Sequence, residues 1–214
     1  MKYHKLVENA KKPNGFWGKM MIKAMNKGHS SLTSWGLEHM NIERTATVLD
    51  IGCGGGKTVD RLCSIVANGK VYGIDYSELS VKSSEKLNSK NILCNKAKIL
   101  QASVSNMPFD DNTFDNITAV ETYYFWPDKE NDVKEVFRVL KQGGTVMLLF
   151  EMLRTDDDPF KWEKVENMLN IKSVTPQEIR AVLESAGFEN INTYTKEGTT
   201  WLCVTAQKPK DDEN

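Results

Sequence analysis

The sequence predicts an α/β protein with a doubly wound, seven-stranded, mostly parallel sheet and a helical cap at its N-terminal end. Short apolar segments typical of strands alternate with longer segments in which apolar residues recur at helical spacing. A glycine-rich turn follows the first of these strands, at 52–56. The last two strands are joined by 197–200, a link short enough to close only an antiparallel hairpin. Together these features favour a sheet with helices on both faces and an antiparallel final strand.

Seven segments fit the strand pattern, and we expect them at 48–51, 71–75, 98–101, 117–121, 145–151, 190–196 and 201–207. Several of the helices between them carry start and stop signals. Ser77 is a suitable N-cap for the helix after the second strand. The residues at 175–178, T-P-Q-E, form a capping box with proline in the first helical turn. An apolar stripe at 133–140 predicts another helix, which we expect to end at Gly143 and Gly144.

Two segments lie outside the minimal sheet. The stretch 16–40 is rich in Phe, Trp, Met and Leu, and it predicts two short helices joined near His29. The stretch 152–174 predicts an amphipathic helix that packs near the entrance of a site. Both segments are therefore candidates for covering a ligand.

Length and charge limit the class of protein. The chain has 214 residues, enough for one domain with a sizeable core. We expect an N-terminal tail and helical cap at 1–45, a ligand-binding domain at 46–207 that forms one compact unit with the cap, and a flexible tail at 208–214. The 28 basic and 29 acidic residues nearly cancel, so no basic face for nucleic acid is expected.

The cysteines and the apolar runs indicate the cellular compartment in which the protein is expected. The four cysteines form no C-x-x-C pair and no small disulfide framework, which favours a reducing cytoplasm. No signal peptide is evident, and no apolar run is long enough to span a bilayer. We therefore expect a cytoplasmic protein without nucleic-acid or membrane partners.

The most informative segment is 50–58, which reads D-I-G-C-G-G-G-K-T. An ATP or GTP phosphate loop would need a glycine where Ile51 stands. The dinucleotide fingerprint G-x-G-x-x-G would need its third glycine where Lys57 stands. A cradle for S-adenosylmethionine (SAM), in which an acidic residue at the strand end precedes G-x-G, fits Asp50, Gly52 and Gly54 without exception. The neighbouring segments decide among the three.

The second strand ends in an acid, within V-Y-G-I-D-Y-S at 71–77. The Asp75 carboxylate can accept hydrogen bonds from both hydroxyls of a ribose, which argues against the phosphate loop. Three further motifs follow in order: I-L-Q-A-S-V-S-N-M-P-F at 99–109 with D-D-N-T-F-D-N-I at 110–117, E-T-Y-Y-F-W-P at 121–127, and F-R-V-L-K-Q-G-G at 137–144.

These motifs, in this order and spacing, resemble the class I SAM-dependent methyltransferases of the small-molecule kind, similar to the ubiquinone/menaquinone-biosynthesis methyltransferases. The resemblance covers about residues 46–206. It implies the Rossmann-like methyltransferase fold, SAM as cofactor, S-adenosylhomocysteine (SAH) as product, and a cap over cofactor and substrate. The sequence departs from the family at Ser103, where many relatives carry an acid that contacts the adenine amino group. A serine hydroxyl or the neighbouring backbone must make that contact here.

The resemblance assigns cofactor contacts position by position. It places Asp50 at the methionine part or the loop itself, Asp75 at the ribose and Tyr76 beside the adenine. Gly52 and Gly54 would let the backbone approach the cofactor. The full predicted set comprises Asp50, Gly52, Cys53, Gly54, Asp75, Tyr76, Ser77, Ala102, Ser103, Val104 and Glu121.

The same resemblance implies that the methyl acceptor approaches after the fourth strand. Methyl transfer from SAM is an in-line displacement, for which the protein mainly supplies proximity and orientation. The aromatic rings of Tyr123, Tyr124 and Trp126 could stabilise the sulfonium or a cationic acceptor by cation–π contact. If the acceptor must lose a proton, His29 in the cap is the candidate base. We therefore expect His29, Tyr123 and Tyr124 as catalytic residues, the same three with Trp126 as the acceptor site, and no metal.

Two other functions stay open at this point. One is a SAM-binding protein with a different activity. The other is a nicotinamide-dependent oxidoreductase on the same kind of sheet, against which Lys57 counts. The sequence is compatible with methylation of O, N, C or S, and with a monomer or a homodimer.

Overall fold

The structure, a computed structural model, describes residues 13–210, except for the side chains of Lys23, Ala24 and Lys27. The predicted N-terminal tail therefore lies almost wholly outside the described residues. The strands are β1 (Thr47–Ile51), β2 (Lys70–Asp75), β3 (Ala97–Gln101), β4 (Phe114–Val120), β5 (Leu140–Phe150), β6 (Glu189–Thr195) and β7 (Leu202–Gln207). The helices are α2 (Gly15–Gly28), α3 (Ser30–Leu37), α4 (Lys57–Ile65), α5 (Glu78–Leu87), α6 (Ser89–Leu93), α7 (Lys129–Val139), α8 (Glu163–Leu169), α9 (Pro176–Ser185) and the 3₁₀ helix η1 (Tyr123–Phe125).

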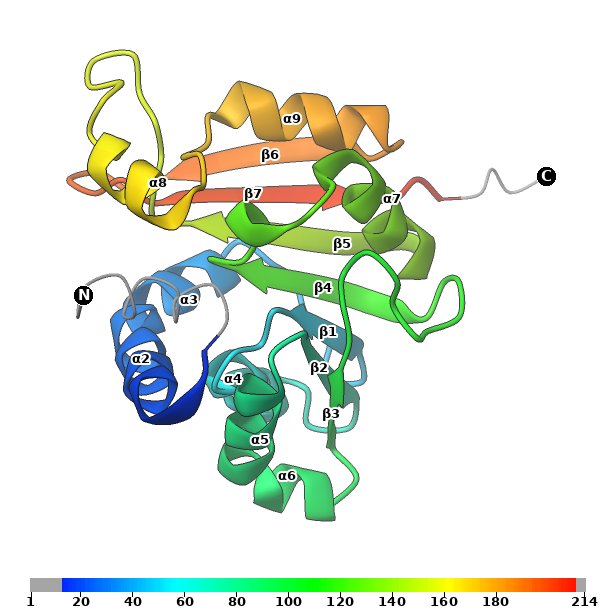
Figure 1. Cartoon of the computed structure of the whole chain (residues 1–214). Coiled ribbons are helices and arrows are strands. Elements are labelled where there is room, and N and C mark those ends of the chain that lie inside the picture. Colours follow the sequence, from blue (N-terminus) through cyan, green and yellow to red (C-terminus); the bar gives the residue numbers. More distant parts are fainter. Residues whose placement is uncertain (1–12, 211–214) are drawn as a thin grey trace.

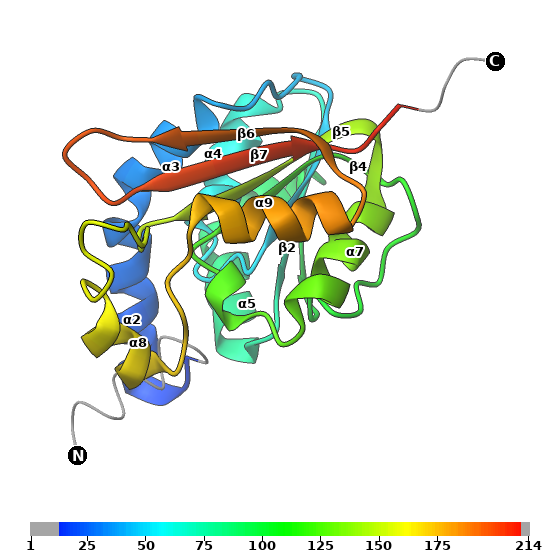
Figure 2. The same ribbon diagram turned by 90° about the horizontal axis from the view of Figure 1, so that it is seen from above.

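The seven strands form one sheet in the order β3-β2-β1-β4-β5-β7-β6 (Figure 1). The neighbours from β3 to β5 pair in parallel, whereas β7 is antiparallel to both β5 and β6. Helices α7 and α9 lie on one side of the sheet, and α3 and α4 lie on the other (Figure 2). The predicted doubly wound fold with an antiparallel final strand is confirmed.

Each face of the sheet buries its own apolar cluster. On one face, residues of α7 and α9 such as Val136 and Ile179 pack against strand residues such as Ile117 and Leu148. On the other face, Val59 and other residues of α4 pack against β1 and β2. Strands buried on both faces read as continuous apolar runs, and this is why they could be recognised in the sequence.

The two segments outside the minimal sheet both form helices. Helices α2 and α3 meet at His29, as predicted, and α2 packs against α5. Helix α8 forms within the stretch that predicted an amphipathic helix. Both α2 and α8 lie at the end of the sheet where the parallel strands β4 and β5 terminate (Figure 1). Open α/β sheets bind ligands at this end.

One predicted boundary is wrong. Helix α7 ends at Val139, and the chain enters β5 directly at Leu140. Gly143 and Gly144 lie inside β5 and do not stop the helix. Gly143 has a φ of +73°, and the pairing with β4 shifts register nearby, between Phe114 and Asn116. The glycines therefore allow a local irregularity in β5. In the sequence, a glycine pair that allows such an irregularity looks the same as one that ends a helix.

Lys208 fixes the C-terminal end of α7. Its ammonium group donates to the carbonyl oxygens of Phe137 and Leu140, at 2.8 and 2.9 Å, and to Oδ1 of Asn112 at 2.9 Å. The residue is only 6% exposed. The ordered unit thus includes Lys208, where the sequence predicted the start of a flexible tail. Residues 211–214 of that tail lie outside the described residues.

We expect Lys208→Met to lower the free energy of unfolding by about 2 kcal/mol, because buried acceptors would lose a charged donor while the apolar stem is kept. Urea unfolding measures the effect. Lys164→Met, at an exposed position of α8, is the matched control and should change stability by less than about 0.5 kcal/mol. Equal effects of the two substitutions would contradict the role of Lys208.

Among residues 13–210, no helix has the length and apolar composition needed to cross a membrane.

Candidate active site

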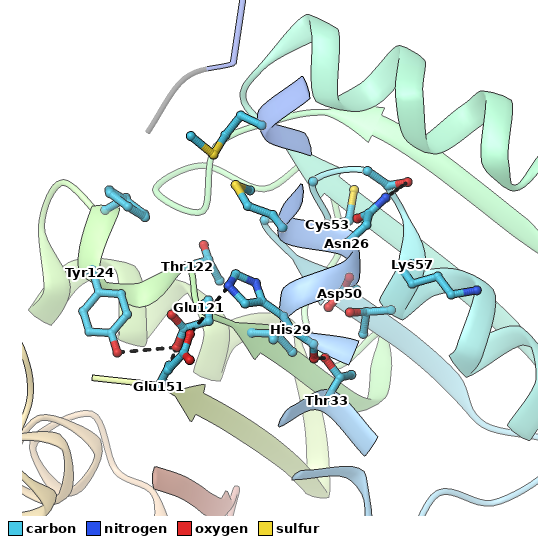
Figure 3. A pocket seen from close by; sticks show the side chains of 18 of the residues that line it. Asn26, His29, Thr33, Asp50, Cys53, Lys57, Glu121, Thr122, Tyr124 and Glu151 are labelled. Atoms are coloured by element: carbon cyan, nitrogen blue, oxygen red, sulfur yellow. Dashed lines mark hydrogen bonds and ion pairs between the residues drawn. The ribbon is translucent and has the colours of Figure 1, made fainter. Parts of the chain in front are cut away.

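A cavity of about 340 Å³ lies at the carboxyl ends of the strands. Its walls come from α2, the glycine-rich loop after β1, the segments after β4 and β5, and α8. Its volume falls in the range of small-molecule sites. Figure 3 shows Asp50, Cys53 and Lys57 on one side of this cavity, and His29, Glu121, Tyr124 and Glu151 on the other.

The glycine-rich loop forms the first wall. Gly52 has a φ of +69°, and a Cβ atom there would lie 2.3 Å from Oγ1 of Thr122. Gly54 has a φ of +51°, but a Cβ there would meet no protein atom closer than 4.0 Å. Gly56, with a φ of +81°, is the N-cap of α4. The loop therefore needs glycine at 52 for internal packing, whereas the space beside Gly54 is open to a ligand.

Two buried carboxylates lie next to this loop. Oδ1 of Asp50 accepts a hydrogen bond from the Thr118 hydroxyl at 2.7 Å. Burial raises the pKa of Asp50 to about 7, against the effect of that bond and with a smaller contribution from Asp75. Asp75 accepts the backbone N–H groups of Gly54, at 2.9 Å, and Ser77, at 2.8 Å. Burial also raises the pKa of Asp75, although both of these bonds oppose it.

The predicted adenine side adjoins Asp75. Tyr76 lines the cavity, and the backbone N–H of Ala102 donates to the Asp75 carbonyl at 3.2 Å. Ala102, Ser103 and Val104 follow β3 but are not among the residues that line the cavity. Ser77 is the N-cap of α5, as predicted, and its hydroxyl donates to the carbonyl of Pro13 at 3.1 Å.

Cys53 is held inside the loop. Its backbone N–H donates to the Ile74 carbonyl at 2.9 Å, which ties the loop to β2. Burial is the main reason that the pKa of the thiol is raised well above its ordinary value, so the thiol stays protonated. Cys53 therefore contributes as a small loop residue and not as a nucleophile.

The opposite wall gathers four titratable side chains. His29 Nε2 lies 4.0 Å from Oε2 of Glu151. The Tyr124 hydroxyl donates to Oε1 of Glu121 at 3.5 Å and accepts the backbone N–H of Met152 at 3.0 Å. The backbone N–H of Glu151 donates to the same Oε1 of Glu121. Burial raises the pKa of Glu121 to about 8 and lowers the pKa of His29, while Glu151 acts on His29 in the opposite direction.

Comparison with known proteins identifies the family. A family model described as a methyltransferase domain matches residues 49–148. The chain is 31% identical over 181 residues to the ubiquinone/menaquinone biosynthesis C-methyltransferase UbiE of Cronobacter sakazakii, covering 73% of this chain and 72% of that protein. The chain belongs to the class I SAM-dependent methyltransferases. This methyltransferase is also 27% identical over 183 residues to the uncharacterized methyltransferase YdaC of Bacillus subtilis, covering 85% of this chain and 93% of the relative.

A solved structure confirms the Rossmann-like methyltransferase fold. The phosphoethanolamine N-methyltransferase 2 of Haemonchus contortus, in complex with phosphomonomethylethanolamine and SAH, has a TM-score of 0.74 and 13% identity. The likeness covers 91% of this chain and 58% of that chain, and at this identity it concerns the fold alone. Family membership makes SAM the cofactor of the methyltransferase. With SAM as the cofactor, neither the phosphate loop nor the dinucleotide fingerprint applies to the segment 50–58, and its role as a SAM cradle is a proposal.

The structure brings together part of the predicted site. Among the predicted residues, the following line the methyltransferase cavity: His29, Asp50, Gly52, Cys53, Gly54, Tyr76, Glu121 and Tyr124. Asp75 and Ser77 lie directly behind the loop. The assignment of individual cofactor contacts remains a proposal based on this arrangement.

Tyr123 and Trp126 do not reach the cavity. They are 3% and 5% exposed, and their rings pack against each other with centroids 5.2 Å apart. Trp126 Nε1 donates to Oγ1 of Thr122 at 3.2 Å. Because Thr122 faces Gly52, these two aromatic residues support the loop from behind, and only Tyr124 of the three predicted aromatic residues lines the cavity.

Sequence reasoning missed several residues of the methyltransferase cavity. Glu151 was overlooked as a site residue, although it ends a predicted strand just as Asp75 and Glu121 do. Arg61 donates to the Ser30 carbonyl at 2.9 Å and to the Ser30 hydroxyl at 3.0 Å, which holds the junction that carries His29. No local pattern marks Arg61, because its partner lies on a distant segment.

Proposed function

We propose that the methyltransferase transfers the methyl group of SAM to a small-molecule acceptor bound in the cavity between η1, α8 and the α2–α3 junction. The observation that carries this proposal is the enclosure of the cavity by α2 and α8. Both helices cover the strand ends and leave room for a compact molecule beside the glycine-rich loop. A polymeric acceptor would instead need an open, charged surface, and the near-zero net charge gives no support for one.

The walls indicate how the residues would act. On the loop side, Gly52 and Gly54 would let the backbone approach SAM, and Asp50 and Asp75 would supply negative charge and hydrogen-bond acceptors to it. On the other side, His29, Glu121 and Tyr124 would face the acceptor and orient its reacting atom. SAM itself supplies the electrophilic methyl group.

The relatives support a small acceptor. UbiE is named for C-methylation in quinone biosynthesis, and the H. contortus enzyme is a phosphoethanolamine N-methyltransferase. These names agree on the size class of the acceptor and differ in the atom methylated. The structure favours a single compact unit of cap and sheet domain around the site, because α2, α8 and the loops after β1, β4 and β5 line one cavity.

The test is SAH release with a panel of phenols, enols, amines and thiols, with transfer RNA as the polymeric comparison. We expect turnover with one small-molecule class. Val165 lines the cavity from α8, so Val165→Trp should lower that turnover by at least about 100-fold while the SAM affinity stays within about twofold. Lys164→Trp, at the exposed neighbouring position, is the control and should keep full turnover. Turnover with transfer RNA alone would refute a small acceptor.

A further inference from the structure

Three side chains able to bind a metal converge in the cavity from distant parts of the chain. His29 comes from the α2–α3 junction, Glu121 from the end of β4 and Glu151 from the end of β5 (Figure 3). One ring nitrogen and one oxygen from each carboxylate all lie within 4.8 Å of one another. The three residues are far apart in the sequence, so no sequence motif predicts the cluster.

Among the described residues, neither carboxyl group of the cluster forms an ion pair with a lysine or an arginine. Oxygens of Glu121 and Glu151 lie within 4.8 Å of each other, and His29 Nε2 lies 4.0 Å from Oε2 of Glu151. Among the side chains that the structure describes, the two cationic ones that line the same cavity have other partners. Lys57 is paired with Asp60 at 2.8 Å, and Arg61 is bound to Ser30. A metal cation would supply the positive charge that Lys57 and Arg61 do not bring to these two carboxyl groups.

The backbone and the surrounding hydrogen bonds support the cluster. Glu121 has a φ of +57°, a left-handed conformation that is uncommon for residues other than glycine. Such strain persists where the surrounding structure imposes it, and it concentrates at ligand sites. The hydroxyl of Tyr124 and the backbone N–H of Glu151 both donate to Oε1 of Glu121 and orient that carboxylate. Outer hydrogen bonds of this kind are a regular feature of metal sites.

We propose that His29, Glu121 and Glu151 bind one divalent transition-metal ion of the Mn²⁺, Fe²⁺ or Zn²⁺ class. One neutral imidazole and two carboxylates suit these ions, whereas Mg²⁺ and Ca²⁺ prefer all-oxygen sites. Metal–ligand distances are about 2.0–2.2 Å, so the ligand atoms must approach one another more closely than in this structure. Glu151 can supply that movement, because its side chain is about half exposed.

Three protein ligands would leave open positions on the ion. If the proposed function holds, a hydroxyl oxygen of the acceptor can occupy such a position, and coordination would lower the pKa of that hydroxyl so that it loses its proton to water. The oxygen would then take the methyl group from the sulfur of SAM, which leaves as SAH. This role rests on the proposed function. Metal binding itself does not, because it needs no acceptor.

The experiment is calorimetric titration of the chelator-treated full-length protein with MnCl₂ and with ZnCl₂, accompanied by electron paramagnetic resonance of Mn²⁺. We expect one saturable site per chain, and weaker binding of MgCl₂ under the same conditions. Glu151→Gln and His29→Gln should each weaken Mn²⁺ binding by at least about 30-fold. Glu163→Gln, at an exposed position of α8, is the control and should bind as the unmodified protein does. Affinity should fall as the pH is lowered, because the ion must displace protons from its ligands.

Two results would overturn the metal site. One is the absence of saturable Mn²⁺ and Zn²⁺ binding. The other is undiminished binding in both Glu151→Gln and His29→Gln, which would place the ion elsewhere. Titration of the same samples with SAM verifies that the variants are folded. Metal binding as expected, in a protein that methylates no small acceptor, would refute the proposed function and leave the metal site standing.

Discussion

Gly52→Ala is expected to destabilise the methyltransferase by about 3 kcal/mol and to abolish SAM binding. A φ of +69° costs a residue with a side chain about 1–2 kcal/mol. The added methyl group would also lie 2.3 Å from Oγ1 of Thr122, which accepts the hydrogen bond of the Trp126 indole. Displacing Thr122 would break that bond, at a further cost of about 1 kcal/mol, and deform the cradle. Urea unfolding and calorimetric titration with SAM measure the two effects.

Gly198→Ala separates the cost of the positive φ from the cost of the clash with Thr122. Gly198 has a φ of +72° but lies in the β6–β7 hairpin, where a Cβ would meet no atom within 4 Å. We expect a loss of about 1 kcal/mol from the backbone alone and an unchanged affinity for SAM. Gly54→Ala should cost as little stability as Gly198→Ala and yet weaken SAM binding by at least about 30-fold, because its methyl group would occupy space left for the cofactor. Unchanged SAM affinity in Gly54→Ala would remove Gly54 from the cofactor site.

Asp50→Asn is expected to stabilise the cofactor-free protein at pH 8 by about 2–4 kcal/mol, since a pKa unit corresponds to about 1.4 kcal/mol. The pKa of Asp50 is raised by burial from 3.8 to about 7. The unfolded chain therefore ionises at lower pH than the folded chain, and stability falls as the pH rises through 7. Asparagine does not ionise, and its side-chain oxygen can still accept the hydrogen bond of Thr118. The difference between the two proteins should disappear near pH 3, where Asp50 is largely protonated in both states.

The same substitution should weaken SAM binding by at least about 10-fold, because it would remove negative charge from the wall where we propose that the cationic cofactor binds. Higher stability together with lower affinity would mark Asp50 as a residue kept for binding at the expense of the fold. Asp157→Asn, in the exposed loop before α8, is the control and should change neither quantity. A stability gain that does not vary between pH 4 and pH 8 would show that titration of Asp50 is not its cause.

Local signals in the sequence were enough to predict the sheet and the cofactor. The buried strands read as apolar runs, and Ser77 and Thr175 cap helices in the structure as their side chains predicted. The cofactor side is predictable because glycines and acids follow directly on strand ends, where the topology of a parallel sheet brings them together. The boundary between α7 and β5 was not predictable, because a glycine pair marks a strand irregularity and a helix stop equally well.

The make-up of the cavity wall opposite the glycine-rich loop depended on the tertiary structure. Tyr123 and Tyr124 are neighbours in a 3₁₀ turn, where successive side chains point about 120° apart, so that one packs in the core and the other lines the cavity. The sequence motif around the two tyrosines does not indicate which of them lines the cavity. The proximity of His29, Glu121 and Glu151 depends on how a cap helix packs across the ends of two strands. The sequence by itself thus determined the fold and the cofactor, because both follow from short-range patterns. Only long-range packing could decide which side chains line the cavity opposite the glycine-rich loop.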